Sequence, residues 1–217
     1  MNPTGKAVIF DLDGVLTDTI EPHYQSWRIL TQEIGVPFNR EINERLRGRS
    51  RPDSLDIILG DRTGEFPADR KAELLRRKNE LFLDLIASMS AADLYPGVGA
   101  LLAELQRRDV PLAVASSSRN SAFILERLGI RDRFRTVVDA NEVPQSKPHP
   151  RVYLLAAERL GVPPERCIAI EDGASGVAAA RAAGMTVIGV GPIENVGAAH
   201  RIFPEMRVLT ADVVLGV

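Results

Sequence analysis

Two acidic residues stand one position apart near the start of the chain, in Phe10-Asp11-Leu12-Asp13-Gly14. They follow a run of apolar and β-branched residues at 6–9, which predicts a strand. Ligands of open α/β sheets bind at the carboxyl ends of strands, and side chains two apart on a strand point the same way. Two carboxylates this close repel unless a cation joins them or one keeps a proton. The pair therefore indicates metal or acid–base chemistry, and a plain acidic loop is the alternative.

Three later segments place polar residues at the ends of predicted strands. Ser116 ends one strand and offers an anion a hydroxyl and the start of a helix. Lys147 lies in a loop stiffened by prolines. Glu171 and Asp172 end another strand and form a hard oxygen pair of the kind that suits Mg²⁺. Each feature alone has a simpler explanation. Ser116 could be a helix cap, Lys147 a solvated loop cation, and Glu171-Asp172 a motif that starts a helix. Together they would provide a nucleophile, a phosphate-binding cation, a hydroxyl donor and a metal site.

The elements that must position these residues alternate in type from about residue 93 onward. Apolar runs predict strands, and periodic segments ending at glycine predict helices. Continuous apolar strands separated by helices imply a parallel sheet covered on both faces. The predicted strands are 111–116, 136–139, 167–170 and 185–190, and the predicted helices are 118–128, 151–160 and 174–183.

The segment between the first two strands differs from the rest of the chain. It shows helical periodicity and no convincing strand, with one helix at 19–34 and a long one at 67–89. We therefore predict an α/β fold: a Rossmann-like parallel sheet with helices on both faces, plus a small all-helical domain inserted after the first strand.

Composition narrows the classes of partner. The 217 residues are 45% hydrophobic and 26% charged, with a formal net charge of −2, so no basic field favours nucleic acid or an anionic membrane. No apolar stretch approaches the length that spans a bilayer, and the N-terminus lacks the apolar core of a signal peptide. The single cysteine, Cys167, excludes an internal disulfide and is expected to be a buried strand residue. We expect a cytoplasmic monomer with neither nucleic-acid nor membrane partners.

The order and spacing of Asp11-x-Asp13-Gly14-Val15, Ser116, Lys147 and Glu171-Asp172 resemble the four-motif signature of the haloacid dehalogenase superfamily of phosphotransferases. The resemblance implies a core domain of residues 1–15 and 93–217 and a helical cap domain of residues 16–92.

The same resemblance implies roles for the motif residues. Asp11 would attack phosphorus and form an aspartyl phosphate, and Asp13 would be the general acid and base. One Mg²⁺ would bind Asp11, the backbone carbonyl of Asp13, Glu171 and Asp172, while Ser116 and Lys147 would hold the phosphate oxygens. Such chemistry agrees with a carboxylate nucleophile and with cations placed on the equatorial phosphoryl oxygens.

The helical insertion carries three further features that bear on the substrate. His23 lies on the apolar stripe of helix 19–34, where packing is the alternative to chemistry. Lys78 lies on the apolar stripe of helix 67–89, where a lysine stem can instead run along apolar surface to water. Arg51 belongs to a basic loop around Gly48, which would otherwise be simply solvated.

Together with Ser118 and Asn120, these features resemble the β-phosphoglucomutase family, which interconverts β-glucose 1-phosphate and glucose 6-phosphate through bound β-glucose 1,6-bisphosphate. The resemblance implies that Arg51, Ser118 and Asn120 grip the phosphate that is not transferred, with Gly48 in the same loop. His23 would help to position Asp13, and Lys78 would contact the sugar phosphate.

Two residues depart from the pattern of the mutase family. Arg49 stands in place of a small apolar residue, and Ser117 replaces an alanine. A sugar-phosphate phosphatase of the same superfamily is therefore the alternative activity, because poor exclusion of water turns mutase chemistry into hydrolysis. A binding protein that keeps the fold without turnover is the alternative from another functional class.

Overall fold

The structure is a computed structural model that describes residues 5–46 and 49–216. The chain forms two compact units. We call Met1–Asp18 together with Met89–Val217 the sheet unit, and Thr19–Ser88 the helical unit.

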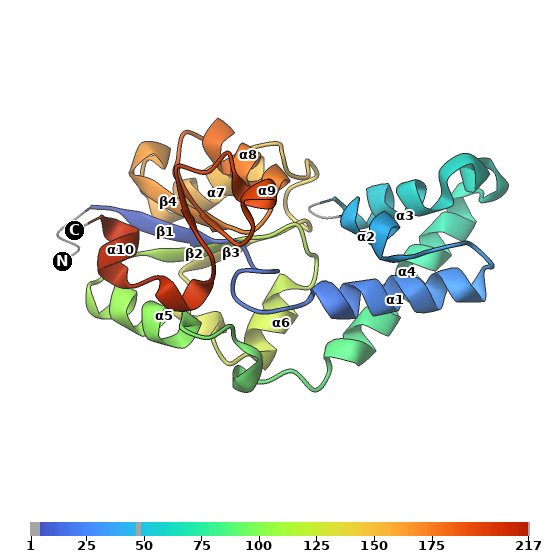
Figure 1. The fold of residues 1–217 in the computed structure, drawn as a ribbon, viewed down its shortest axis with the longest axis horizontal. Helices are drawn as coiled ribbons and strands as arrows, with labels where there is room; N and C mark the ends of the chain where they lie inside the picture. The colour runs from blue at the N-terminus through green and yellow to red at the C-terminus, as the bar shows by residue number, and fades with distance from the viewer. Residues whose placement is uncertain (1–4, 47–48, 217) are drawn as a thin grey trace. The chain divides into compact units, whose positions relative to one another are not determined.

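The sheet unit contains six parallel strands in the order β3-β2-β1-β4-β5-β6 (Figure 1). The direction in which successive strands are added to the sheet reverses at β1, because β2 pairs with one side of β1 and β4 pairs with the other side. Such a reversal opens a crevice at the carboxyl ends of the strands. The strands are β1 (Ala7–Phe10), β2 (Leu112–Ala115), β3 (Thr136–Val138), β4 (Cys167–Glu171), β5 (Thr186–Val190) and β6 (Arg201–Phe203).

Helices cover both faces of this sheet, which confirms the predicted fold class. Figure 1 shows α5 and α10 on one face and α7 and α8 on the other. The α-helices of this unit are α5 (Val98–Arg107), α6 (Ser121–Arg127), α7 (Arg151–Leu160), α8 (Ala174–Ala182), α9 (Ile193–Val196) and α10 (Ala211–Leu215). Short 3-10 turns at Ala91–Asp93, Arg131–Arg133, Pro164–Arg166 and Met206–Val208 complete it.

The central strand is buried on both faces, as a parallel sheet requires. All four residues of β1 are fully buried, and Ala7 and Ile9 belong to the core beneath α7 and α8. Small side chains such as Ala113 and Ala169 let that helical layer approach the sheet closely. The consequence is a rigid platform from which the strand ends present their polar residues.

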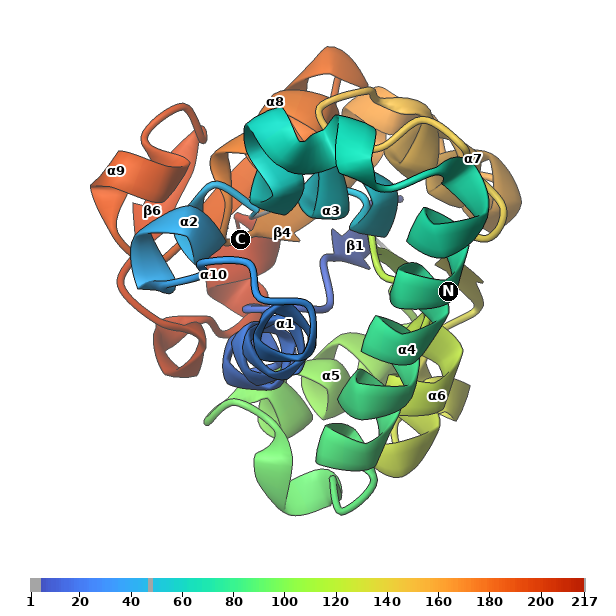
Figure 2. The same cartoon turned by 90° about the vertical axis from the view of Figure 1, so that its right-hand side faces the viewer.

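The helical unit has a hydrophobic core of its own, built around Trp27, Leu30, Leu55 and Leu74. Its two longest helices pack against each other, and Figure 2 views α1 nearly end-on with α4 beside it. No strand occurs among its described residues, as predicted. The unit consists of α1 (Ile20–Glu33), α2 (Arg40–Glu44), α3 (Arg51–Leu59), a 3-10 segment (Gly60–Glu65) and α4 (Ala68–Ile86).

Several elements were not predicted individually. Helices α3 and α5 have nine and ten residues, and the remaining ones are short. Strand β6 has three residues, and helices α2, α9 and α10 have five or fewer. Cys167 is buried at the start of β4, as expected, and burial raises the pKa of its thiol to about 11. None of the helices in the described ranges is both long enough and apolar enough to cross a bilayer.

Candidate active site

Asp11 is the first residue after β1, and its own backbone holds it at the carboxyl end of that strand. Its N–H donates to the carbonyl of Ile170 on β4, at 3.0 Å. The residue is 7% exposed. The regular strand ends at Phe10, and the chain then turns so that the N–H of Gly14 donates to the carbonyl of Thr17 at 2.9 Å. The alternation of a strand therefore does not extend to Asp13, which lies in this turn.

Lys147 connects the ends of three strands through one buried ammonium group. Its Nζ lies 2.7 Å from Asp11 Oδ1, 3.0 Å from the carbonyl of Ala115 and 2.6 Å from Glu171 Oε1. An ammonium has three protons to donate, so these three acceptors use all of them. Burial alone would lower the pKa of Lys147, but the charges of Asp11 and Glu171 raise it above the ordinary lysine value. The group is therefore a fixed positive charge.

An acidic cluster surrounds this ammonium group. Oxygens of Asp11, Glu171 and Asp172 lie within 4.8 Å of one another. Burial raises the pKa of Asp11 well above its ordinary value; Lys147 opposes the rise, and the charges of Glu171, Asp13 and Asp172 add to it. Four carboxylates against one ammonium carry a formal charge of −3 when ionised. Hard oxygen ligands in such excess fit a divalent cation.

Two glycines make room for the carboxylates. A Cβ on Gly14, which has φ +89°, would overlap the carboxylate of Asp172. A Cβ on Gly176, in the first turns of α8, would overlap the carboxylate of Glu171. The acidic groups thus lie directly against backbone, a packing that any larger residue at these two positions would disrupt.

The turn after β2 holds the serines singled out from the sequence. Ser116 is buried, and its Oγ accepts from the N–H of Ser118 at 3.0 Å. The Oγ of Ser118 accepts from the N–H of Asn120 at 3.2 Å. Helix α6 begins at Ser121 with Asn120 as its N-terminal cap residue, at the end of the range of starting positions predicted from the sequence. The Oγ of Ser117 is buried without a hydrogen-bond partner in the described chain.

In the helical unit, the buried Lys78 pairs with the half-buried His23. Lys78 is 1% exposed, which excludes the alternative that its ammonium reaches water. Its Nζ lies 2.8 Å from His23 Nδ1 and over the rings of Phe82 and Trp27, at 4.7 and 5.2 Å from their centroids. Because a charged ammonium only donates, Nδ1 of His23 accepts and Nε2 carries its proton.

The pKa of His23 is well below the ordinary histidine value. Burial is the largest cause, and the positive charges of Lys78 and Arg51 lower it further. The ring also stacks on Phe82, with centroids 4.1 Å apart. His23 is therefore a neutral side chain that presents an N–H donor.

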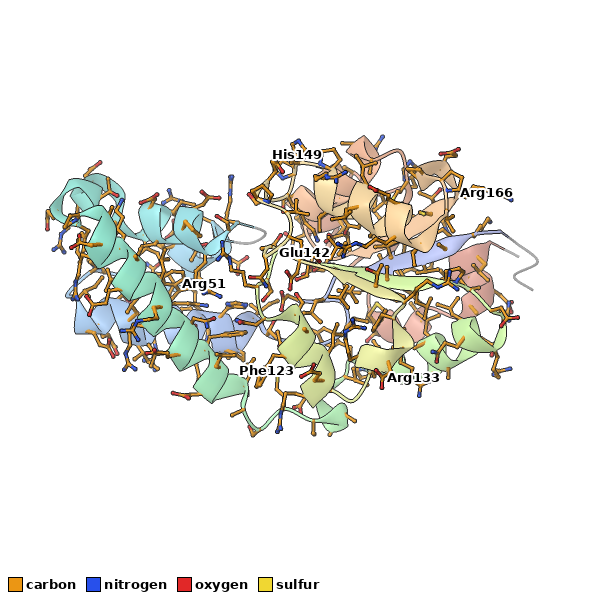
Figure 3. The ribbon with its side chains drawn as sticks, turned by 180° about the vertical axis from the view of Figure 1, so that it is seen from behind. Arg51, Phe123, Arg133, Glu142, His149 and Arg166 are labelled. Atoms are coloured by element: carbon orange, nitrogen blue, oxygen red, sulfur yellow. The ribbon has the colours of Figure 1, made fainter. Side chains whose placement is uncertain are left out.

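Arg51 occupies the first position of α3 (Figure 3). Ser50 caps this helix by accepting from the N–H of Asp53 at 3.3 Å, and its hydroxyl donates to the Asp53 carboxylate at 2.6 Å. The neighbouring Arg49 is exposed, and Gly48 lies outside the described residues. The basic loop of the sequence therefore includes the capped N-terminus of α3, and Arg51 is the first residue of that helix.

Comparison with known proteins decides the family. The profile of the haloacid dehalogenase-like hydrolases matches residues 6–184. The chain belongs to this family. It is accordingly an enzyme of the haloacid dehalogenase superfamily, and the resemblance seen in the sequence motifs is confirmed.

Individual members of the haloacid dehalogenase family give a finer comparison. A β-phosphoglucomutase of Bacillus subtilis is 42% identical over 211 residues, covering 96% of this chain and 93% of that protein. A phosphorylated carbohydrates phosphatase of Thermotoga maritima is 32% identical, covering 83% and 82%. The crystal structure of a Clostridium difficile β-phosphoglucomutase superposes with a TM-score of 0.94 at 36% identity, covering 97% and 96%.

The geometry adds site residues that sequence reasoning missed. Tyr153 of α7 donates from its hydroxyl to Glu171 Oε1 at 2.5 Å, and the carbonyl of Ala115 accepts from Lys147. Neither position carries a signal in the sequence, because one reads as a core aromatic and the other as a small strand residue. His149 and His200, the two histidines of the sheet unit, are both exposed, and Figure 3 shows His149 at the outside of its loop.

Proposed function

We propose that this protein interconverts β-D-glucose 1-phosphate and D-glucose 6-phosphate in a Mg²⁺-dependent reaction. The observation that carries the proposal is the buried Asp11, held 2.7 Å from Lys147 beside two further carboxylates. The similarity to β-phosphoglucomutases over nearly the whole chain supports this choice of substrate.

In the proposed reaction, Asp11 is the nucleophile. One of its oxygens bonds to phosphorus as the bond from phosphorus to the sugar oxygen breaks, giving an aspartyl phosphate. Asp13 protonates the departing oxygen and then removes a proton from the sugar hydroxyl that attacks the phosphoenzyme. Starting from the phosphoenzyme, β-glucose 1-phosphate takes the phosphoryl group on its 6-hydroxyl, which gives bound β-glucose 1,6-bisphosphate and frees Asp11. The bisphosphate then turns and transfers its 1-phosphoryl group to Asp11, so that glucose 6-phosphate leaves and the phosphoenzyme is restored. Added β-glucose 1,6-bisphosphate primes the enzyme by the same transfer to Asp11.

The positive groups of the site would neutralise the transferred phosphoryl group. Lys147 is proposed to hold its oxygens through positive charge, and Ser116 through its hydroxyl. Asp11, the backbone carbonyl of Asp13, Glu171 and Asp172 are the residues that would hold Mg²⁺. When bound, the ion supplies positive charge to the equatorial oxygens. The unpartnered hydroxyl of Ser117 supports anion binding at this edge, because a buried donor without a partner is costly.

The second phosphate of the intermediate needs a site of its own. We propose that Arg51, Ser118 and Asn120 bind it, with Gly48 in the same loop. A phosphate there would meet the guanidinium of Arg51, which offers charge-assisted hydrogen bonds.

His23 and Lys78 are proposed to act together on the substrate side of the helical unit. The neutral His23 donates from Nε2 and would help to position Asp13. Lys78 would contact the sugar phosphate while keeping its hydrogen bond to Nδ1. Their fixed geometry supports a role beyond packing, because burying an ammonium is expensive without a compensating partner.

Hydrolysis of sugar phosphates is the second candidate activity. The similarity to the Thermotoga phosphatase supports it, and both activities share the aspartyl phosphate. They differ in whether water or a sugar hydroxyl attacks that intermediate.

A product assay separates the two activities. The enzyme is given β-glucose 1-phosphate, Mg²⁺ and a trace of β-glucose 1,6-bisphosphate, and glucose 6-phosphate and free phosphate are followed separately. We expect glucose 6-phosphate to exceed free phosphate by at least tenfold. Free phosphate without isomerised sugar would contradict the mutase proposal and support the phosphatase.

The matched variants in this assay are Arg51→Ala and Arg70→Ala, the latter on the exposed face of α4 beside Glu73. Loss of a charge-assisted phosphate contact costs about 1.5–3 kcal/mol, or roughly 10- to 100-fold. We expect R51A to lose that factor in mutase turnover while hydrolysis of a small monophosphate falls less than threefold. R70A should match the wild type, and equal losses of both activities in R51A would contradict the assignment.

A further inference from the structure

Tyr153 is a fully buried polar residue that no part of the proposed reaction uses. It lies in the first turn of α7, the helix that packs across β1, β2 and β3. Its hydroxyl reaches the carboxyl end of β4, where it lies 2.5 Å from Glu171 Oε1. A tyrosine hydroxyl has an ordinary pKa of about 10, so it carries its proton at neutral pH and donates to this carboxylate.

The hydrogen bonds of Glu171 divide unequally between its two oxygens. Oε1 accepts from Tyr153 and from Lys147 Nζ, at 2.5 and 2.6 Å. A carboxylate oxygen has two acceptor positions, so these two donors fill Oε1. Oε2 accepts only the N–H of Asp172, at 3.2 Å, among the residues that the structure describes. One acceptor position therefore stays open on Oε2.

The surroundings leave this carboxylate little freedom to turn. Gly176 lies so close that any Cβ there would overlap both oxygens. Lys147 cannot take over the role of Tyr153, because its three protons already go to Asp11, Ala115 and Glu171. Lys147 Nζ also lies 3.4 Å from the Tyr153 oxygen, but it has no further proton to donate there. The same Nζ lies 5.0 Å from the centroid of the tyrosine ring.

We propose that Tyr153 is a positioning residue whose hydroxyl occupies Oε1 of Glu171 and so presents Oε2 to the divalent cation. The inference rests on the metal-dependent chemistry proposed above, but not on the identity of the sugar. Groups that orient a metal ligand from outside the coordination shell typically change affinity by 10- to 100-fold when removed.

The test is a calorimetric titration of metal-stripped protein with Mg²⁺ alone. It compares the wild type with the Tyr153→Phe and Tyr24→Phe variants. Phenylalanine keeps the buried ring beneath Lys147 and removes only the hydroxyl. Tyr24 stacks on Phe38 in the helical unit and provides the matched loss of a hydroxyl elsewhere. We expect the Mg²⁺ dissociation constant to rise at least tenfold in Y153F and to change less than twofold in Y24F.

A second measurement keeps packing and positioning apart. Hydrolysis of a small phosphomonoester is followed against Mg²⁺ concentration, after the urea midpoint has shown that each variant is folded. Positioning predicts that saturating Mg²⁺ restores the Y153F rate to within threefold of wild type. A wild-type dissociation constant in Y153F, or a rate loss that no Mg²⁺ concentration restores, would overturn the inference. Because the Mg²⁺ titration contains no sugar, it tests the role of Tyr153 even if the mutase assay gives a negative result.

Discussion

Lys147 shows how single residues set the charge of this site. One ammonium satisfies acceptors at the ends of β1, β2 and β4, and it offsets part of the repulsion among the buried carboxylates. Removing it would leave Asp11 and Glu171 buried without their counterion, which typically costs 3–5 kcal/mol. The same group is therefore both a structural connection between strands and a proposed phosphate-binding charge.

At this scale the sequence was informative where residue type limits the chemistry. Asp11 directly follows β1, and Glu171 and Asp172 lie at the end of β4, as predicted. Lys147 reaches them from the loop between β3 and α7. Carboxylates and lysines are rarely fully buried unless they are paired. Tyr153 was missed because a tyrosine on an apolar helix face is ordinary core material. Only the three-dimensional contact with Glu171 distinguishes it.

Ser117→Ala tests whether the unpartnered hydroxyl after β2 is kept for an anion. In buffer without phosphate, we expect the free energy of unfolding to rise by about 1 kcal/mol, because a buried donor without a partner is removed. Inorganic phosphate should then bind several-fold more weakly than to wild type. Urea denaturation and a phosphate titration measure the two effects, and a variant less stable than wild type would contradict the expectation.

Among the elements, α1, α3 and α4 together determine the state of His23. Lys78 comes from α4 and Arg51 from α3, and both are positive groups near a histidine of α1. The sequence indicated that Lys78 lies on the buried stripe of α4, with Leu74 and Phe82, and the structure confirms it. Its hydrogen bond to Nδ1 could not be predicted, since helical periodicity says which face is buried but not which helix lies opposite.

The low pKa of His23 predicts a pH-dependent stability of the helical unit. Below the ordinary histidine pKa of about 6.5 the unfolded chain takes up a proton that the folded ring refuses. The free energy of unfolding should therefore fall as the pH is lowered from 7.5 to 5.5, by at most about 1.4 kcal/mol per pH unit from this residue. Trp27, buried in the helical core, gives the fluorescence signal for urea titrations.

His23→Gln isolates this contribution because glutamine keeps an acceptor for Lys78 and does not titrate. The decline between pH 7.5 and 5.5 should be shallower in H23Q than in wild type, and unchanged in His149→Gln, whose ring is exposed. An identical pH dependence in H23Q and wild type would show that His23 is not held neutral.

For the whole molecule, the formal charge of −2 offers no general attraction to an anionic substrate. Under our proposal, affinity for phosphate comes from local cations such as Lys147 and Arg51, and from the metal ion proposed among the carboxylates. The parallel sheet and the inserted helical unit followed from the alternation of apolar and helical segments. The short elements after β5 did not, because three to five residues show too little periodicity to be recognised.

The central claim is that Asp11 carries the phosphoryl group, and trapping the phosphoenzyme tests it most directly. The enzyme is incubated with Mg²⁺ and β-glucose 1,6-bisphosphate labelled on phosphorus, quenched in acid and digested. We predict one acid-stable, hydroxylamine-sensitive label on the peptide containing Asp11, and none in Asp11→Asn. Label that persists in D11N, or that maps to another residue of the wild type, would contradict the account.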